Sequence, residues 1–490
     1  MALDPQMKIL IVEDFKASRK MEIEILKKAG FGNVIEAENG EAAIEILKKE
    51  KDVKLIISDW NMPGKDGYEL LVWVRSDDSY QEIPFIMATA QAEKKEAYKA
   101  VKAGVSNFIS KPFTPEELKL VIDDTFGVSK ESNDASRETK LPRKTASGKI
   151  RLSVGHIQIT DHLVLGALSY LISSGNLKPR YFELETRCMS GWNPVQKALE
   201  TGEIDAALIL APIAMDLFSV GVPIRLVLFA HKNGSICVKS KKVTTRESFR
   251  RSFRDKTFYI PHVLSVHHML SNMFFHEIGL KGGLVGKEAV DVTFEVIPPV
   301  KMPEFIARSP EACGFMVAQP VGAKAIAEGG ADLLFLSGEL WEYHPCCVVA
   351  MQQDYINAYD DAVHEFVDML VQAGIFITQN PEISALIAIK FLDPDKSLKL
   401  RGAVLENVLT EPHGIKTDDL FPIIEDLDKM QRYMTDKMDI GILIDLEKFI
   451  DIRFADAACD KSVRGKYSSV IHDPSEIIWK IFNRDKPGDE

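Results

Sequence analysis

The stretch "VKLIISDWNMPGKDGYELL", residues 53–71, decides how the N-terminal part of the chain folds. Its apolar run is typical of a strand that is buried on both faces, and the run stops at Asp59. A turn rich in proline and glycine follows, before a helix-like segment begins at Tyr68. A buried strand followed by a turn and a helix is typical of a parallel α/β sheet. The carboxylate that ends such a strand then lies at the rim of the sheet, where ligands bind.

The same alternation continues from residue 7 to residue 127. Segments with helical spacing separate the apolar runs, and "TPEE" predicts a helix start with Thr114 as its cap. Five strands alternating with five helices predict a doubly wound parallel five-stranded sheet. The predicted strands are 8–12, 33–37, 54–58, 84–88 and 107–110.

Composition narrows the class of protein further. The 490 residues include 60 Lys and Arg against 72 Asp and Glu, for a net charge of −12. This charge argues against broad binding to nucleic acid or to anionic membranes. Six cysteines without a framework spacing predict reduced thiols and a cytoplasmic location. We also expect no signal peptide and no membrane span, because neither pattern occurs.

Residues 128–148, "VSKESNDASRETKLPRKTASG", contain very few apolar residues and are predicted to be a flexible linker. A second α/β region begins at residue 149, and the chain becomes mainly helical from about residue 390. The predicted organisation is an N-terminal domain over 1–127, the linker, a second domain over 149–460, and a C-terminal tail over 461–490.

Polar side chains end the first, third, fourth and fifth predicted strands, and they should meet at one edge of the sheet. They are Glu13 and Asp14, then Asp59, Thr89 and Lys111. Crowded carboxylates repel one another unless a cation lies between them, and Mg²⁺ prefers such oxygen ligands. We therefore expect a phosphoryl-transfer site in which Asp59 is the nucleophile and Lys111 neutralises phosphoryl oxygens. The turn should direct the backbone carbonyl of Asn61 at the metal.

Four motifs carry a family resemblance: "ILIVEDFKASRK", "LIISDWNMPGKDGYELL", "PFIMATA" and "AGVSNFISKPFTPEEL". Together they resemble the receiver domain of bacterial response regulators. The resemblance implies that Asp59 is the phosphoacceptor and that Glu13 and Asp14 bind Mg²⁺. It also implies that Thr89 and Phe108 form the switch pair of the family. Glu13 stands where many members have Asp.

The second region begins with a strand, a turn and a helix in "GHIQITDHLVLGALSYL". The helix is predicted to start near Asp161, after Thr160, so its N-terminal amides offer a site for an anion or a polar group. An ordinary helix cap remains the alternative interpretation.

Several longer pieces of the second region resemble the substrate-binding proteins of nitrate, bicarbonate and sulfonate ABC uptake systems. They include "TGEIDAALILAP", "SVHHML", "VIPPVKM" and "AQPVGAKAIAEGGADLLFLSGELWEYHP". The resemblance implies two α/β lobes around a hinge, with a ligand in the cleft between them. The first lobe should cover about 149–240 and resume after about 345, and the second lobe should fill the middle.

Five positions match cleft residues of that family by the resemblance. Trp192 matches an aromatic residue that packs on the ligand, and His267 matches a histidine that contacts the anion. Ser235 stands where Gln is usual, and Ala318 stands where Gly is usual. Cys347 stands where nitrate and bicarbonate binders have a lysine. Because this cation is absent, a neutral or larger ligand is as suitable as an anion held by protonated His267 and backbone amides.

Neither a zinc site nor a redox-active disulfide is predicted in this region. His267, His268 and His276 are not predicted to form a zinc site, because adjacent histidines on a helix diverge by roughly 100°. Cys346 and Cys347 are expected to be cleft or core thiols, since adjacent cysteines rarely form an unstrained disulfide.

The predicted function is a response regulator whose output module binds a small molecule. The expected partners are a sensor histidine kinase, a small anion or polar metabolite, and a protein that receives the output. No direct nucleic-acid contact is expected. The chain is not expected to be an enzyme beyond its own phosphorylation and hydrolysis of the acyl phosphate. Two alternatives remain open: an enzyme of the type that makes thiamin or menaquinone precursors, and a binder that sequesters another regulator until ligand arrives.

Overall fold

Strand β3 (Val53–Asp59) is the centre of the N-terminal sheet in the computed structural model of the chain. It pairs in parallel with β1 and β4, and the five parallel strands are ordered β2-β1-β3-β4-β5. The other strands are β1 (Lys8–Val12), β2 (Val34–Ala37), β4 (Phe85–Thr89) and β5 (Asn107–Ser110). The structure describes residues 3–77, 79–89, 100, 103–111, 113–126, 144–145, 147–243, 249–287, 289–394, 396, 398–460 and 469–483.

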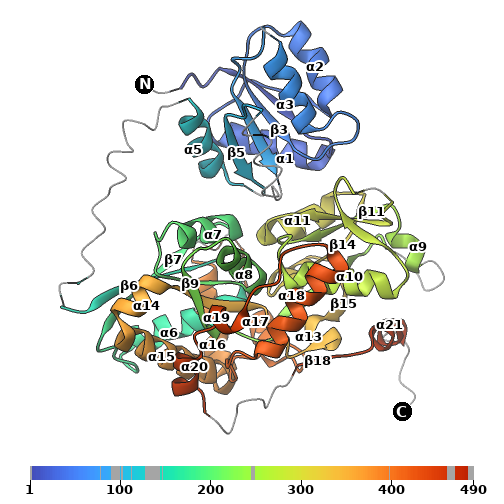
Figure 1. Cartoon of the computed structure of the whole chain (residues 1–490). Helices are drawn as coiled ribbons and strands as arrows, with labels where there is room; N and C mark the ends of the chain where they lie inside the picture. The colour runs from blue at the N-terminus through green and yellow to red at the C-terminus, as the bar shows by residue number, and fades with distance from the viewer. Residues whose placement is uncertain are drawn as a thin grey trace. The chain divides into compact units, whose positions relative to one another are not determined.

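Both faces of this sheet are buried, which explains its continuous apolar runs. Along β1, Leu10 and Val12 face one core while Ile9 and Ile11 face the other. Helices α2 and α3 cover the first face and α1 and α5 cover the second (Figure 1). These helices are α1 (Lys16–Lys28), α2 (Gly40–Lys49), α3 (Gly67–Ser76) and α5 (Pro115–Thr125). The prediction of a doubly wound parallel sheet is confirmed.

Local sequence signals set the starts of two of these helices. Asp66 and Glu69 form a capping box at the start of α3. At α5 the backbone N–H of Glu117 donates to Thr114 Oγ1 (3.2 Å), and the N–H of Thr114 donates to Glu117 Oε2 (2.7 Å). The cap predicted from "TPEE" is therefore confirmed. Most of the predicted helix that precedes β5 lies outside the described residues.

The chain divides into two compact units, and the second begins at Pro142. Most of the predicted linker, residues 128–143 and 146, lies outside the part of the chain that the structure describes. The domain boundaries given above therefore stay predictions.

The second unit has two α/β lobes, each built on its own sheet. The first lobe has the strand order β7-β6-β8-β17-β9, in which β17 is antiparallel to both neighbours. Its strands are β6 (Ile150–His156), β7 (Phe182–Cys188), β8 (Ala206–Leu210), β9 (Ile224–Phe229) and β17 (Cys347–Gln352). Its helical elements are η2 (Thr160–His162), α6 (Leu163–Ser173), α7 (Trp192–Glu200), α8 (Ala211–Ser219), α14 (Gln353–Ala358), α15 (Asp360–Gln379), α16 (Pro381–Leu392), α17 (Gly402–Thr410) and α20 (Ile452–Ala458).

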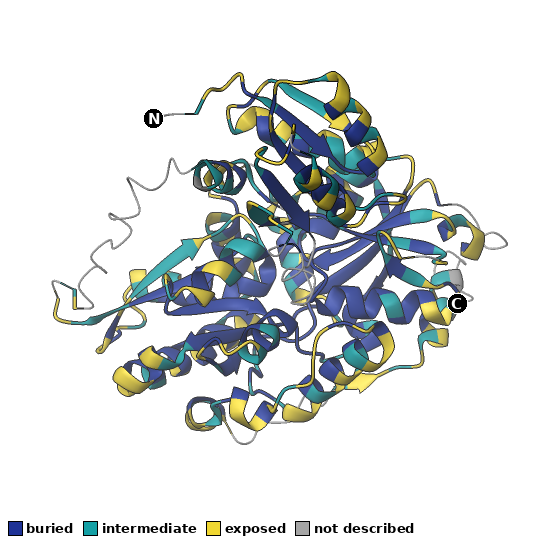
Figure 2. Cartoon of the chain, turned by 45° about the horizontal axis from the view of Figure 1, so that its top comes forward, coloured by how far each residue is buried: buried dark blue, intermediate teal, exposed yellow. Residues whose placement is uncertain are grey.

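The second lobe has the strand order β12-β13-β11-β14-β10-β15. Its strands are β10 (Ser235–Ser240), β11 (Lys256–Ile260), β12 (Gly282–Leu284), β13 (Val292–Val296), β14 (Ala312–Ala318) and β15 (Ala331–Leu336). Its helical elements are α9 (Phe249–Phe253), α10 (Val266–Glu277), η4 (Pro299–Lys301), α11 (Met302–Arg308), α12 (Val321–Ala327) and α13 (Ser337–Leu340). The strands of both lobes are largely buried (Figure 2).

Two chain segments cross between the lobes, at 230–234 and 337–346. They run side by side, because the N–H of Asn233 donates to the carbonyl of His344 (2.9 Å) and Lys232 forms an antiparallel bridge with Pro345. The first lobe was predicted to extend to about 240. That limit was too late, because β10 already pairs with β14 and β15 of the second lobe.

Helix α18 (Ile424–Met438) contacts α8 of the first lobe and α10 of the second. In the described part of the predicted C-terminal tail, β18 (Val470–Ile471) pairs with β16 (Trp341–Glu342) and α21 (Pro474–Asn483) packs on α10. A short helix, α19 (Leu446–Phe449), lies between α18 and α20 in sequence. Among the described residues, no single helix has the length and apolar composition to span a bilayer, and the pair α15 and α16, bent by 118°, passes that test only when joined.

Gly67 should be essential for the junction of β3 and α3. A Cβ atom at Gly67 would lie 2.0 Å from the carbonyl oxygen of Asp59, so Gly67→Ala has to move the helix or the strand. We expect the free energy of unfolding of this sheet to fall by about 1–3 kcal/mol, as in other overpacked sites. Hydrogen exchange of β3 peptides in the full chain measures the change. Gly32→Ala is the control, because no atom lies within 4 Å of the added carbon; equal exchange in both variants would contradict the prediction.

Candidate functional site

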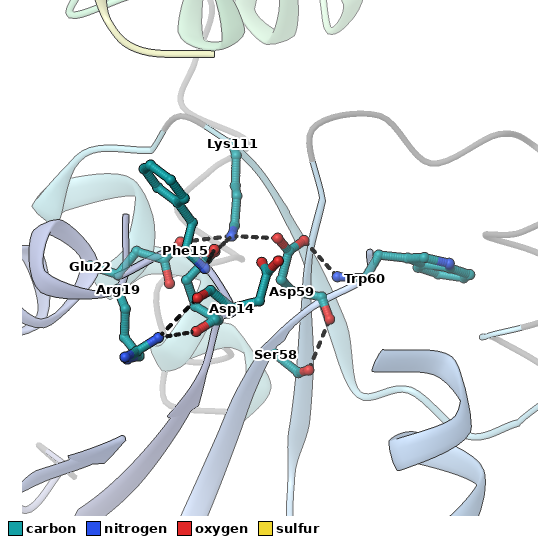
Figure 3. A network of polar contacts seen from close by, with 9 residues as sticks. Asp14, Phe15, Arg19, Glu22, Ser58, Asp59, Trp60 and Lys111 are labelled. Atoms are coloured by element: carbon teal, nitrogen blue, oxygen red, sulfur yellow. Dashed lines mark hydrogen bonds and ion pairs between the residues drawn. The ribbon is translucent and has the colours of Figure 1, made fainter. Parts of the chain in front are cut away.

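An acid pocket lies at the carboxyl ends of β1 and β3. Glu13 and Asp14 directly follow β1, and Asp59 ends β3. One carboxylate oxygen from each of the three lies within 4.8 Å of the other two. Asp59 accepts a hydrogen bond from the backbone N–H of Trp60 (2.6 Å), which fixes its carboxylate (Figure 3). The predicted carboxylates therefore converge on one point.

Lys111, which follows β5, extends into this pocket. Its ammonium forms ion pairs with Glu13, with Glu22 at 2.8 Å and with Asp59 at 3.2 Å. Burial lowers the pKa of Lys111, but the surrounding carboxylates outweigh burial and hold the pKa well above its usual range. For Glu13, burial raises the pKa, but the attraction of Lys111 is larger and the net direction is downward. Lys111 is thus a fixed cation against acids that are only 3–13% exposed.

The other carboxylates of the pocket are harder to ionise. Burial, together with the charges of Glu13 and Asp59, raises the pKa of Asp14 to about 7. Burial also raises the pKa of Asp59 to about 6, because the attraction of Lys111 offsets only part of the effect. Asp14 Oδ1 is buried and has no hydrogen-bond partner among the described residues. One cation is therefore too few for these acids, and the pocket can accommodate another.

Glu22 was missed in the sequence. It projects from α1, it is 3% exposed, and burial raises its pKa to about 8. The signal was available: Glu22 lies one helical turn before Leu26, and these two are the buried residues of α1. It was overlooked because an acid on an amphipathic helix normally faces solvent.

The other predicted receiver residues lie around this pocket. Thr89 is buried at the end of β4, and its carbonyl accepts a hydrogen bond from the N–H of Lys111 (2.8 Å). Phe108 on β5 is partly buried against the core beneath α2 and α3. Asn61 is exposed, two residues after Asp59.

In the second unit, the predicted ligand residues form a linked series at the boundary of the lobes. Ser235 pairs with Ala318 across β10 and β14, and its hydroxyl lies 2.9 Å from His267 Nε2. Thr160 donates both its N–H (2.9 Å) and its hydroxyl (2.7 Å) to the carbonyl of Gln319, which follows β14 in the second lobe. Thr160 therefore joins the lobes, and both of its donors are used in that contact.

Trp192 and Cys347 lie on the first-lobe side of the same boundary. The Trp192 ring packs edge-on against His162 at 5.6 Å, and its indole N–H is buried with no hydrogen-bond partner among the described residues. Cys347 begins β17, and its Sγ lies 3.9 Å from Asp161 Oδ2.

One of the two alternatives for the cleft, an anion held by protonated His267, stays a prediction, and the burial of this ring disfavours its protonation. Burial lowers its pKa to about 3, helped by His344 and His231, so the ring is neutral near pH 7. His267 and His268 also make separate contacts, since His268 Nδ1 lies 2.9 Å from the carbonyl of Val263.

His231, which the sequence did not single out, lies against Asp161 in the same region. Its Nε2 lies 3.3 Å from Asp161 Oδ2, and both side chains are 0% exposed. Burial opposes protonation of His231, but the carboxylate of Asp161 outweighs it and raises the pKa to about 10. The backbone N–H of Cys347 donates to His231 Nε2 (3.3 Å), so this imidazole contacts the position where the lysine is missing. Only the fold brings residues 161, 231 and 347 together.

Comparisons with known proteins fit these two architectures. A five-stranded receiver fold with an acid pocket and a two-lobed binding-protein fold define the class of protein. Residues 9–123 match the response regulator receiver domain, and residues 145–390, just over half of the chain, match the NMT1-like family. The chain belongs to the NMT1-like family and carries a receiver domain ahead of it.

Relatives of the receiver are single-domain chemotaxis proteins. A CheY homolog of Campylobacter jejuni is 44% identical over 121 residues, which cover 25% of this chain and 93% of that protein. CheY1 of Helicobacter pylori is 43% identical over 123 residues, covering 25% and 99%. The N-terminal domain is therefore homologous to CheY-type response regulators.

Solved structures resemble the second unit. The ligand-binding component of an ABC-type import system from Staphylococcus aureus, solved with zinc bound, superposes with a TM-score of 0.55 and 20% identity, covering 63% of this chain and 98% of that one. The nitrate-binding protein NrtA of Synechocystis gives 0.53 and 17%, covering 68% and 97%. At these identities the likeness shows the fold alone.

Buried histidines should make the second unit sensitive to acid. Burial lowers the pKa of His156 to about 4, against an ordinary value of 6.5. Because the unfolded chain binds the proton first, stability should be full above pH 6.5 and should fall as the pH drops toward about 4. His156→Phe keeps a ring against Phe391, whose centroid is 4.3 Å away. In that window the free energy of unfolding should fall more steeply with decreasing pH in wild type than in this variant. The two slopes should differ by up to about 1.4 kcal/mol per pH unit.

Chemical denaturation of the full chain at several pH values measures this slope. Above pH 7 the two stability curves should run parallel. Identical slopes below pH 6.5 would show that His156 does not titrate on unfolding.

Proposed function

We propose that the chain is a response regulator that is phosphorylated on Asp59, and that its output module is a ligand-binding NMT1-like domain. The convergence of Glu13, Asp14 and Asp59 within 4.8 Å, with Lys111 3.2 Å from Asp59, is the observation that carries the receiver part. A sensor histidine kinase is the expected phosphodonor. All six cysteines are free, which agrees with a reducing, cytoplasmic setting.

The pocket fits Mg²⁺, which receiver domains typically bind. Its donors are hard carboxylate oxygens, one of which, Asp14 Oδ1, is buried without a partner. Glu13, Asp14 and Asp59 would hold the ion together with the backbone carbonyl of Asn61. When bound, the ion neutralises phosphoryl oxygens.

The residues of the chain would perform the transfer by position and charge. A carboxylate oxygen of Asp59 attacks the phosphorus of the phosphohistidine. The P–N bond breaks, its electron pair stays on the imidazole nitrogen of the kinase, and that nitrogen takes a proton from solvent. Lys111 stabilises the phosphoryl oxygens, and the hydrogen bond from Trp60 keeps the carboxylate aligned.

Signal transmission would begin at the edge of β4 and β5. The backbone N–H of Lys111 donates to the carbonyl of Thr89. A movement of Lys111 toward the phosphoryl group would therefore shift Thr89. Thr89 and Phe108 then act as the switch pair, changing the surface that a partner protein recognises. Ligand bound by the NMT1-like domain would bias the same equilibrium, because coupling between sites is reciprocal.

The ligand-binding role is supported by buried polar atoms where the lobes meet. The Trp192 indole nitrogen, His267 Nδ1 and the side-chain amide of Asn233 lack hydrogen-bond partners among the described residues. Such atoms cost about 1–3 kcal/mol each unless they are satisfied, so a small anion or polar metabolite would stabilise the domain. Ser235, His267 and Ala318 from one lobe and Thr160, Trp192 and Cys347 from the other are the proposed contacts.

Asp59→Asn should abolish phosphorylation by a small phosphodonor in the presence of Mg²⁺, since an amide cannot attack phosphorus. Intact-mass spectrometry should show one added phosphoryl group on the wild-type chain, removable by hydroxylamine as expected for an acyl phosphate. Asp52→Asn is the control, because Asp52 is 66% exposed and pairs only with Lys8 among the described residues. Equal labelling of the Asp59→Asn variant and wild type would refute Asp59 as the acceptor.

A ligand that closes the lobes should raise the melting temperature of the full chain. At 100 times its dissociation constant, mass action adds about 2.7 kcal/mol of stability. A thermal-shift screen of small anions, amino acids and pyrimidines tests this, with Ser235→Ala as the variant that should lose the effect. Turnover of a hit would favour the enzyme alternative, and a protein complex that dissociates on ligand addition would favour sequestration. If no compound stabilises the chain, a small anion or polar metabolite is not its ligand.

A further inference from the structure

Four side chains with metal-binding atoms meet at the crossing segments of the second unit. They are Asp161 from η2, His231 from the first crossing segment, Cys346 from the end of the second, and Cys347 from the start of β17. One atom from each lies within 4.8 Å of all the others. Asp161 Oδ2 is 3.3 Å from His231 Nε2, 3.6 Å from Cys346 Sγ and 3.9 Å from Cys347 Sγ. These separations are near those between ligand atoms around a tetrahedral ion with bonds of about 2.0–2.3 Å.

The strands of the first lobe hold the cluster in place. The carbonyl of Cys346 accepts from the N–H of Ala211 (2.9 Å), and the carbonyl of Cys347 accepts from the N–H of Ala230 (2.9 Å). All four residues are 0–1% exposed. Backbone pairing at the start of the inner strand β17 therefore fixes the thiols. A preorganised site is expected on such a rigid element.

Buried polar atoms at the cluster are incompletely satisfied. Asp161 Oδ1 and His231 Nδ1 have no hydrogen-bond partner among the described residues. Both lie beside Gly234, where a Cβ atom would come within 3.3 Å of Asp161 Oδ1 and 3.2 Å of His231 Nδ1. Gly234, with φ +96°, leaves this side of the cluster clear of any side chain of its own. Asp161 Oδ1 and His231 Nδ1 are the second polar atoms of these two side chains, whereas the short distances within the cluster run through Asp161 Oδ2 and His231 Nε2.

We infer that Asp161, His231, Cys346 and Cys347 form a binding site for a divalent ion of the zinc class. Two sulfurs, one imidazole nitrogen and one carboxylate oxygen make a four-coordinate donor set typical of Zn²⁺. Mg²⁺ and Ca²⁺ are excluded as preferred ions, because they select oxygen ligands. A metabolite cannot lie between the four atoms, since they are less than 4.8 Å apart.

This inference rests on the proposed ligand-binding role of the NMT1-like domain and gives that role a ligand class. Binding forms four metal–ligand bonds. The two thiols and His231 lose any protons on their ligating atoms to the solvent, and no electron is transferred. The ion would join η2 to both crossing segments. Its occupancy would then limit how the lobes turn about the hinge.

The test uses the full-length chain, stripped of metal by a chelator and kept reduced. Excess Mg²⁺ fills the oxygen-rich pocket of the receiver, and Zn²⁺ or Co²⁺ is then titrated. No cysteine lies before Cys188, so a sulfur signal reports the second unit only. We expect one ion per chain, thiolate-to-cobalt charge-transfer absorption, and X-ray absorption with two sulfur ligands about 2.3 Å from zinc.

Variants then assign the ligands. Cys346→Ser with Cys347→Ser should weaken zinc affinity by more than about 100-fold, because even the hydrogen-bond partners of ligands contribute about 10–100-fold. His231→Gln should weaken it as well. Cys188→Ser is the control, since this exposed thiol lies outside the cluster. Circular dichroism of each metal-free variant checks folding, and the X-ray absorption of wild type does not depend on any variant.

A zinc site without sulfur ligands, or unchanged affinity in the double-cysteine variant, would overturn the inference. So would a chain that binds no zinc when reduced. If a small anion or metabolite stabilises the chain while zinc does not, the inference fails and the proposed sensor function stands. If zinc binds but Asp59 is not phosphorylated, the receiver proposal fails alone.

Discussion

Lys111 lies among carboxylates in a pocket almost closed to water, and the receiver site depends on this arrangement. Buried like charges repel strongly, and one ammonium cannot neutralise every acid that surrounds it. Burial first, and the neighbouring carboxylates second, raise the pKa of Asp14 to about 7 and that of Asp59 to about 6. On the proposed function, a further cation would stabilise the pocket and would allow a phosphoryl group to bind. The rigid parallel sheet maintains Glu13, Asp14, Asp59 and Lys111 at short range, since each ends or follows a strand, and Glu22 is added from α1.

Buried charges paired with opposite charges also occur in the second unit, at the segments that cross between its lobes. Lys232 is 0% exposed and pairs with Asp419 at 2.7 Å, and its neighbour His231 pairs with Asp161. Removing one member of a buried pair leaves an uncompensated charge, which typically costs about 3–5 kcal/mol. The charged groups therefore determine where the crossing segments lie.

The two units contribute different kinds of chemistry to one polypeptide. The receiver offers hard oxygen donors and a lysine, which suit magnesium and phosphate. The NMT1-like domain offers thiols, imidazoles and an indole in a dry boundary between lobes, which suit softer or less charged ligands. On the proposed function, this separation would let one chain respond to two unrelated inputs.

The sequence alone determined the receiver almost completely. Each functional residue there follows a strand with a strong apolar pattern, so the order of strands along the chain predicts which side chains meet at the edge. Glu22 was the exception, because only packing shows that its face of α1 turns inward. The NMT1-like fold was also predicted from sequence, and several predicted cleft residues do lie where the lobes meet.

The cluster of Asp161, His231, Cys346 and Cys347 was decided by tertiary structure alone. Its members are up to 186 residues apart in sequence. They meet because the chain builds the second lobe and then returns to the first, where β17 inserts between β8 and β9. No local pattern encodes that return, and burial within the assembled hinge, rather than residue type, sets the charge of each group.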